Sequence, residues 1–236
     1  MSRAPGVRIV DISHEIAPQA VLSGAYVLLG AYREFPEGTV HMAVVDPGVG
    51  SSRRGIILRT DRYLFVGPDN GLFSLAAPQP DAVYEIRPSA YLAESISNTF
   101  HGRDVFAPVA AALAIDVRPE ELGAAIDDPH RLAPITHIRG SEIQSQIIHI
   151  DRFGNAVTGI ERGDLSNSTL PLSFRLRVDE NSIEIQKQFY AEEPLLPRRP
   201  FVIWGSLDFL EISVAQGSAA EVLGLSQGQA VSLELG

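Results

Sequence analysis

The sequence has no cysteine and only one lysine, Lys187, among its 236 residues. Without a thiol, the chain cannot form disulfides, bind zinc through sulfur or use a cysteine nucleophile. The single lysine lies in a polar, strand-like segment, so a Walker-type phosphate loop is absent and Schiff-base chemistry is disfavoured. The sequence has no GxGxxG, GxSxG or HExxH pattern, and its six histidines lack metal-ligand spacing. We therefore expect no metal site.

Basic blocks and long apolar runs are missing as well. The net charge is −10, from 19 Lys and Arg against 29 Asp and Glu, which argues against a nucleic-acid partner. No apolar run reaches the roughly 18 residues that a membrane span needs, so no membrane association is expected. The N-terminus lacks the apolar core of a signal peptide. With 45% hydrophobic and 20% charged residues, the composition is that of an ordinary globular protein, which we expect to be cytoplasmic.

The first half of the chain alternates strand-like and helix-like patterns. Apolar or β-rich runs predict strands at Val7–Ile12, Thr39–Val45, Gly55–Arg59, Tyr63–Val66 and Ala82–Ile86, the third and fourth flanking a hairpin turn. Helices are predicted at Val21–Phe35, Leu72–Ala76 and Arg103–Ile115. Because alternating strands and helices form βαβ units, we expect an α/β N-terminal domain over residues 1–137. Its sheet should be mostly parallel, with helices on its faces.

Residues 138–236 have a different character, because strand patterns follow one another almost without helices. The expected strands are Ile143–Ile150, Ala156–Ile160, Leu172–Val178, Ser182–Gln188, Phe201–Trp204, Phe209–Val214 and Ala230–Leu235. Only Ala219–Leu223 has a helical pattern. We therefore expect a β-rich C-terminal domain, either a sandwich or a barrel.

The segment HMAVVDPGVGSSRR carries the first candidate site. An apolar run ends at Asp46 in a Pro/Gly-rich turn, and Arg53 and Arg54 follow. A buried strand that ends in an acid places a charge at the edge of a sheet, where ligands bind in open α/β folds. Asp46 could orient or deprotonate a nucleophile, and Arg53 could hold a carboxylate or water. Equally, Asp46 could cap its own turn and the arginines could be a solvated pair.

A second segment, SNTFHGRD, places His101 just before the helix expected from Arg103. Exposed N–H groups and the helix dipole disfavour a charged imidazole at that position. His101 should therefore stay neutral, able to accept a proton or a hydrogen bond. The alternative is a purely structural histidine at the start of a helix.

In the second half, the turn from Asp151 to Asn155 follows a strand and groups an acid, the ring of Phe153 and an amide. Such a turn could hold an amino group, stack on a flat base and read a polar edge. The alternative is a connecting turn with a core phenylalanine. Likewise, Ser206 after another strand could donate to a carboxylate or belong to a plain turn.

Taken in order, six segments resemble the S-adenosyl-L-methionine hydroxide adenosyltransferases, relatives of the fluorinases and chlorinases. They are IVDISHEIAPQ, FPEGTVHMAVVDPGVGSSRR, FVGPDNGLF, SNTFHGRDVFAPVAAALA, IDRFGNAVTGI and GSLDFLEISVAQGSAAEVLG. This ordered series covers nearly the whole chain and is far more specific than any one motif. The resemblance implies a two-domain subunit and a homotrimer. Its ligand would lie between the N-terminal domain of one subunit and the C-terminal domain of its neighbour.

The resemblance also implies a reaction, the hydrolysis of S-adenosyl-L-methionine to adenosine and L-methionine by attack of water or hydroxide at the ribose C5′, without a cofactor. The family's Asp-Arg-His trio corresponds to Asp46, Arg53 and His101, with Arg54 as the alternative to Arg53. Halogenating relatives have tyrosines in place of Asp46 and His101 and a serine in place of Gly102. This sequence is therefore expected to use water.

Substrate contacts follow from the same resemblance. Asp151 is expected to meet the methionine amino group and Ser206 its carboxylate, while Phe153 stacks on adenine. The remaining expected contacts are Asn155 on the methionine or adenine side, Gln19 on the ribose side, Phe100 and Gly102.

One departure from the family lies at the N-terminus. Relatives usually begin with an extra strand and a Thr-Asp-Phe-Gly-like segment whose acid binds the ribose hydroxyls. This chain opens at the strand after it, VRIVDI, so we expect an N-terminal domain that is truncated relative to the family. The alternative function is then a protein that binds S-adenosylmethionine or a nucleoside without turnover.

Overall fold

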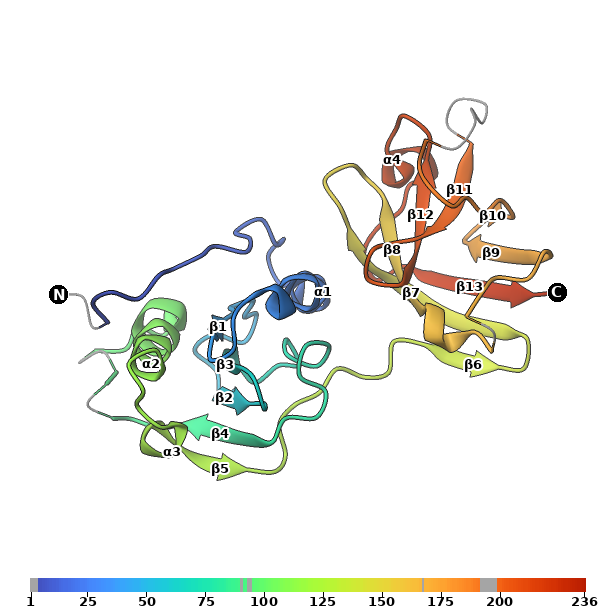
Figure 1. Cartoon of the computed structure of the whole chain (residues 1–236). Coiled ribbons are helices and arrows are strands. Elements are labelled where there is room, and N and C mark those ends of the chain that lie inside the picture. The colour runs from blue at the N-terminus through green and yellow to red at the C-terminus, as the bar shows by residue number, and fades with distance from the viewer. Residues whose placement is uncertain (1–3, 90, 93–94, 167, 192–198) are drawn as a thin grey trace. The chain divides into compact units, whose positions relative to one another are not determined.

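The computed structural model describes residues 4–89, 91–92, 95–166, 168–191 and 199–236 (Figure 1). The chain forms two compact units, Met1–Leu132 and Ala133–Gly236. Each unit has its own core of buried apolar side chains. In the described parts of both units, no helix is long and apolar enough to cross a membrane.

The first unit is built on a five-stranded sheet (Figure 1). In spatial order its strands are β1 (Val40–Met42), β3 (Leu64–Pro68), β2 (Gly55–Arg59), β4 (Ala82–Ile86) and β5 (Gly123–Ile126). Only β1 and β3 run parallel, and the other three pairings are antiparallel. The expectation of a mostly parallel sheet is therefore wrong, because the sheet is mixed.

The mixed directions have a local cause. The turn between β2 and β3 is closed by Thr60, whose N–H donates to the carbonyl of Tyr63 at 3.0 Å. A connection this short joins only antiparallel neighbours, since a parallel pair needs a crossover of about a dozen residues or more. The hairpin was predicted from the sequence, and it already excluded a parallel arrangement of these two strands.

Helices cover both faces of this sheet. They are α1 (Val21–Ala31), continued by the 3-10 turn η1 (Tyr32–Glu34), the π-helical turn η2 (Gly102–Phe106), which leads into α2 (Ala107–Leu113), and α3 (Pro119–Leu122). Because side chains alternate along a strand, Ile56 of β2 packs in the cluster with α1, whereas Ile57 packs in the cluster with α2. The unit is thus a three-layer α/β/α arrangement.

Two elements predicted for this unit do not form. Val7–Ile12 forms no strand, and the side chain of Ile9 is 85% exposed. A β-rich pattern yields a strand only beside a partner, and no described strand pairs with this segment. Leu72–Ala76 forms turns instead of a helix, although Leu72 and Phe73 are buried. The predicted strand Thr39–Val45 also shortens to the three residues of β1.

A buried histidine lies inside the aromatic part of this core. His41 of β1 is 4% exposed and stacks on Phe65 with ring centroids 5.2 Å apart. The rings of Tyr32, Phe35 and Tyr63 meet its ring edge-on. Its Nε2 has no hydrogen-bond partner among the described residues. Burial lowers the pKa of His41 from 6.5 to about 4, because the charged imidazolium would have to lose its hydration.

This histidine should make the first unit sensitive to acid. The folded state holds His41 neutral, so its stability contribution is complete above pH 6.5 and is lost as the pH falls towards 4. The loss should reach about 2–3 kcal/mol at the acid end of that range. Urea unfolding at pH 7 and pH 4.5 should show a smaller decrease for a His41→Phe variant than for the parent. Equal decreases in both proteins would contradict this assignment.

The second unit is an antiparallel, nearly closed sheet (Figure 1). Its strands are, in spatial order, β10 (Asn181–Ile183), β9 (Phe174–Val178), β13 (Ala230–Leu235), β7 (Glu142–Ile150), β8 (Ala156–Glu161), β12 (Phe209–Val214) and β11 (Pro200–Trp204), with β6 (His137–Arg139) beside β7. The chain after β10 lies along β11, where Lys187 N–H donates to Val202 at 2.9 Å. The two ends of the sheet thereby approach each other, as in a barrel.

Local signals in this unit agree with its structure. The 3-10 turn η3 (Arg162–Asp164) follows β8. The helix α4 (Ala219–Leu223) is capped by Ser218, whose hydroxyl accepts the N–H of Glu221 at 3.1 Å. It ends at Gly224, which has a positive φ of 66°. The predicted strand Ser182–Gln188 is shorter than expected, because pairing in β10 stops at Ile183.

Candidate active site

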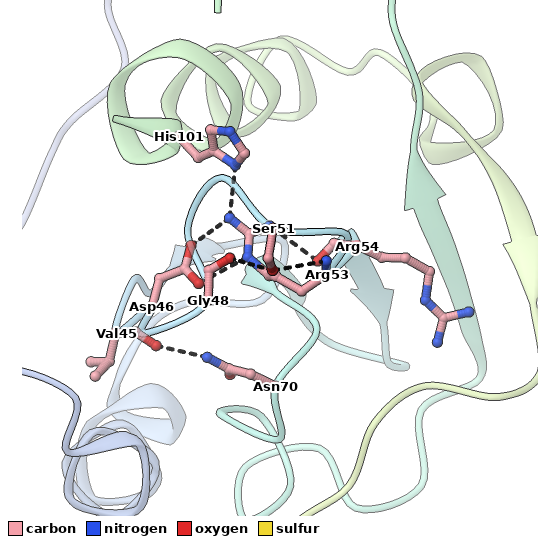
Figure 2. Close-up of polar contacts among 8 residues, drawn as sticks. All are labelled: Val45, Asp46, Gly48, Ser51, Arg53, Arg54, Asn70 and His101. Carbon is pink, nitrogen blue, oxygen red and sulfur yellow. Dashed lines mark hydrogen bonds and ion pairs between the residues drawn. The ribbon is translucent and has the colours of Figure 1, made fainter. Parts of the chain in front are cut away.

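The turn that follows β1 carries Asp46 and Arg53 (Figure 2). Ser51 closes this turn from inside, because its hydroxyl donates to the carbonyl of Gly48 at 2.7 Å and accepts the N–H of Arg53 at 3.2 Å. The backbone N–H of Ser51 donates to the same carbonyl at 3.1 Å. The Gly-rich segment thus folds back, and Arg53 comes to lie beside Asp46.

Arg53 contacts both Asp46 and His101 directly (Figure 2). Arg53 Nε donates to Asp46 Oδ1 at 2.8 Å, and Arg53 Nη2 contacts both Asp46 Oδ2 and His101 Nδ1, the latter at 2.8 Å. The side chains of Arg53 and Asp46 are only 11% and 5% exposed. The guanidinium therefore forms a forked, desolvated ion pair and links the carboxylate to a histidine 48 residues away in the chain.

The contact with Arg53 defines the protonation of His101. A guanidinium has only donors, so the imidazole Nδ1 must be the acceptor. His101 is then neutral, with its proton on Nε2, as the sequence suggested for a histidine at this place. Arg53 also lies over the ring of Phe106 at 5.2 Å, which fixes the plane of the guanidinium.

The loop before η2 positions His101. Asp104 is buried and accepts the N–H of Ser97 at 2.9 Å, which closes the loop around His101. Its ion pair with Arg103, together with the bond from Ser97, lowers the pKa of Asp104 to about 2. Asp104 is therefore a structural carboxylate. The helix that follows begins as a π-turn, a feature that is frequent at functional sites.

The side chain of Arg54 points away from Asp46 (Figure 2). Its Nε donates to Asp69 Oδ2 at 2.8 Å and its Nη1 to Asp128 Oδ1 at 2.7 Å. The hydrogen bond to Asp128, more than the bond to Asp69, raises the pKa of Arg54. Of the two neighbouring arginines, the structure brings only Arg53 to Asp46 and His101.

A glycine permits the close approach of the two site segments. Gly50 has a positive φ of 77°, and a Cβ built on it would lie 2.2 Å from the carbonyl oxygen of Asn98. No side chain fits at that distance, so the turn carrying Asp46 and Arg53 touches the loop carrying His101 through bare backbone. In the sequence, only the glycine itself indicates this contact.

Three of the expected substrate residues of the second unit form a self-contained turn between β7 and β8. Asp151 Oδ1 accepts the N–H groups of Phe153 and Asn155 at 2.8 and 2.9 Å. Asn155 Nδ2 donates to Asp151 Oδ2 at 2.9 Å. The ring of Phe153 is 69% exposed, so it is not the core residue of the alternative interpretation. An acid, an amide and an exposed ring are thus held together in one rigid turn.

The remaining expected residues lie in turns or at their ends. Ser206 is exposed in the turn between β11 and β12. Gln19 adopts a positive φ of 68° two residues before α1. Phe100 is exposed beside His101, with Arg103 over its ring at 4.9 Å. A Cβ on Gly102 would meet Val44 only at 3.8 Å, so a serine fits there sterically.

One buried acid was missed by the sequence reasoning. Glu211 lies within the apolar strand β12, and its Oε2 accepts the hydroxyl of Tyr190 at 2.6 Å. Burial raises the pKa of both Glu211 and Tyr190. The signal was a charged residue inside the otherwise apolar run FLEISV. Within the described residues, no group of three or more His, Cys, Asp or Glu side chains is arranged to hold a metal ion.

Fold and site together define a class of two-domain proteins, in which an α/β domain with a buried Asp–Arg–His cluster precedes an antiparallel β domain. Residues 1–123 match the family model described as the SAM hydroxide adenosyltransferase N-terminal domain, and residues 145–232 match that of the C-terminal domain. The chain belongs to the SAM hydroxide adenosyltransferase family, which confirms the resemblance seen in the sequence.

Individual relatives agree with this assignment. The chain is 40% identical to the (R)-S-adenosyl-L-methionine hydrolase of Thermus thermophilus, over 98% of this chain and 89% of that protein. It is 37% identical to the protein of the same name from Methanocaldococcus jannaschii, over 92% and 79% of the two chains. A fluorinase of Actinoplanes is 29% identical over 75% of this chain and 70% of its own length.

A solved structure supports the fold. The crystal structure of an uncharacterized conserved protein from Thermotoga maritima superposes with a TM-score of 0.85 at 31% identity. The match covers 98% of this chain and 90% of that one. Both units of the fold therefore have counterparts in a solved relative.

Proposed function

We propose that this protein is an enzyme that hydrolyses S-adenosyl-L-methionine to adenosine and L-methionine. The observation that carries the proposal is the buried contact of Asp46, Arg53 and His101, at the positions of the family's Asp-Arg-His trio. Relatives that are 34–40% identical over nearly the whole chain carry the name of this hydrolase. The alternative, binding without turnover, is not favoured by those names.

The reaction needs a well-placed water more than it needs an acid. In the step proposed here, a water oxygen forms a bond to the ribose C5′ while the C5′–S bond breaks. The bonding pair moves to sulfur, which changes from a sulfonium to the neutral thioether of methionine. Because the leaving group needs no protonation, catalysis depends on aligning water with the C–S bond and removing its proton.

Asp46 is the group best suited to that proton. Each of its oxygens accepts one bond from Arg53, and a carboxylate retains further lone pairs for a water molecule. Arg53 holds the carboxylate in one orientation, because a forked pair leaves it no freedom to rotate. His101 has its Nδ1 occupied by Arg53 and can donate from Nε2, so its role is to orient the water or the ribose.

The second unit supplies most of the proposed substrate contacts. The turn from Asp151 to Asn155 presents a carboxylate for the methionine ammonium and the exposed ring of Phe153 for the adenine. Ser206 is exposed for the methionine carboxylate. In the first unit, Gln19 is exposed for the ribose side, and Phe100 is a further exposed contact. We propose a homotrimer with the sites at subunit interfaces. Light scattering on the purified protein tests whether it is a trimer.

Water is favoured over halide by three residues. The chain has Asp46 and His101 where the halogenating relatives have tyrosines, and Gly102 where they have serine. A charged carboxylate beside the attack position repels a halide ion and attracts the hydrogen atoms of water. Chloride is therefore expected to give no halogenated nucleoside.

The test is product analysis in labelled water. S-adenosylmethionine is incubated with the protein in H₂¹⁸O. The nucleosides are then separated by chromatography, and their masses are measured by mass spectrometry. The expected product is adenosine with one ¹⁸O at the 5′ position, and a His101→Ala variant should form much less. If the parent binds the substrate by calorimetry and yields no adenosine above this variant, the protein is a binder and the proposal is wrong.

Gly50 provides a second prediction for the same assay. Gly50→Ala should lower kcat/KM at least about tenfold, because a Cβ 2.2 Å from Asn98 forces the Asp46–Arg53 turn away from His101. The matched control is Gly38→Ala, since Gly38 has a similar φ of 82° and nothing within 4 Å of its Cβ position. Both variants bear the same backbone strain, so similar activities in the two would refute the steric explanation.

A further inference from the structure

We propose that Asn70 is a positioning residue that holds Asp46 in place for the reaction proposed above, on which this inference rests. Asn70 Nδ2 donates to the carbonyl oxygen of Val45 at 2.8 Å (Figure 2). Val45 directly precedes Asp46, at the point where the chain leaves the sheet beyond β1. The amide of Asn70 therefore supports the peptide unit from which the carboxylate projects.

Asn70 can act as a support because it is itself held on both sides. Its Oδ1 accepts the N–H of Leu72 at 3.2 Å, and its own N–H donates to the carbonyl of Pro68 at 3.0 Å. Pro68 is the last residue of β3, the strand parallel to β1. Gly71 has a positive φ of 89° and packs closely against Leu132, which excludes a larger residue from the turn. The turn is thus a rigid extension of the neighbouring strand.

The same turn also holds the other end of the loop formed by residues 46–53, which carries Asp46 and Arg53. Asp69, which is buried, donates its N–H to the carbonyl of Arg54 at 2.9 Å and accepts the Nε of Arg54 at 2.8 Å. Its other oxygen accepts the N–H of His130 at 2.7 Å. Two adjacent residues, Asp69 and Asn70, therefore hold residues 45 and 54 on either side of the 46–53 loop. Asn70 fixes the Asp46 end and Asp69 fixes the Arg53 end.

The chemistry of the position calls for asparagine. The carbonyl of Val45 needs a donor and the N–H of Leu72 needs an acceptor, and a side-chain amide supplies both at once. An aspartate of the same shape keeps the acceptor but turns a lone pair towards the Val45 carbonyl. Alanine removes both bonds without adding a charge. The two substitutions therefore separate the loss of the donor from the effect of a new charge.

The experiment compares Asn70→Asp and Asn70→Ala with a matched control. Both variants should lower kcat about 10- to 100-fold, as expected for displacement of a reacting group by about 1 Å, while KM stays within about threefold. The control is Thr39→Val, because Thr39 donates to the carbonyl of Pro36 at 2.7 Å, before β1 begins. It loses a similar side-chain to backbone bond, and its kcat should remain that of the parent.

A double-mutant cycle tests whether the effect runs through Asp46. In an Asp46→Ala background, Asn70→Ala should reduce the remaining kcat less than about twofold. The reason is that the effects of substitutions at residues that act as one unit are not additive. A residue that only supports the fold would cause equal losses in both backgrounds. That result would overturn the positioning role, as would kcat values of the single variants within twofold of the parent.

Crystal structures provide a readout that does not depend on activity. The Arg53 Nε–Asp46 Oδ1 contact of 2.8 Å should persist in Thr39→Val and be lost or displaced in Asn70→Asp. An unchanged contact in the Asn70 variant overturns the inference. Failure of the proposed function is recognised separately, because the parent protein then forms no adenosine, and the structures still decide the role of Asn70.

Discussion

Replacing Asp46 with asparagine is expected to reduce kcat for adenosine formation by about 10²- to 10⁴-fold, the usual contribution of a positioned general base. The new amide keeps the shape of the carboxylate but can no longer take a proton from water. One of its two ends also presents N–H donors to the guanidinium of Arg53, which has only donors itself. The variant should therefore lose both proton acceptance and the orientation of the ion pair.

Kinetics on the folded variant measure this effect. The steady-state kcat is compared with that of Asp61→Asn, a control in the exposed turn between β2 and β3, which should match the parent. KM is expected to change little, because Asp46 acts on water and the proposed substrate contacts lie elsewhere. An Asp46→Asn variant that retains more than about a tenth of the parental kcat would show that Asp46 is not the proton acceptor.

The local patterns of the sequence predict the bounds of individual helices and strands better than they predict which strands pair and in which direction. Helix Ala219–Leu223 and strands Phe209–Val214 and Ala230–Leu235 have the bounds expected from periodicity. The direction of a strand depends on which strand lies beside it, and that information is spread over the whole chain. The sheet of the first unit was therefore misjudged as mostly parallel, and Val7–Ile12 was misjudged as a strand.

The candidate site shows the same limit at the scale of single residues. Asp46, Arg53 and His101 could be named from motifs, yet the choice between Arg53 and Arg54 needed the structure. The side chains of two adjacent residues can point in opposite directions, and the sequence does not say which of the two faces Asp46. The role of Asn70 was also hidden, because its partner is a backbone carbonyl that any residue would provide.

Removing Arg53 should be the most damaging single change to stability in this site. Arg53→Met leaves the carboxylate of Asp46 buried without its cation, which costs about 3–5 kcal/mol in comparable pairs. Urea unfolding measures this loss. The control is Arg62→Met, since the ion pair of Arg62 with Glu37 is exposed and should contribute at most about 1 kcal/mol. Similar losses in the two variants would contradict the buried pair.

A double variant separates the structural part of this ion pair from its catalytic part. Asp46→Leu combined with Arg53→Met replaces both charges with apolar side chains of similar volume, which is often neutral or stabilising for a buried pair. The double variant should therefore regain most of the stability that Arg53→Met loses, and its adenosine formation should stay at background. The reason is that the buried ion pair serves to position and deprotonate the attacking water and contributes little net stability to the fold. Recovery of activity together with stability would show instead that Asp46 and Arg53 serve only the structure.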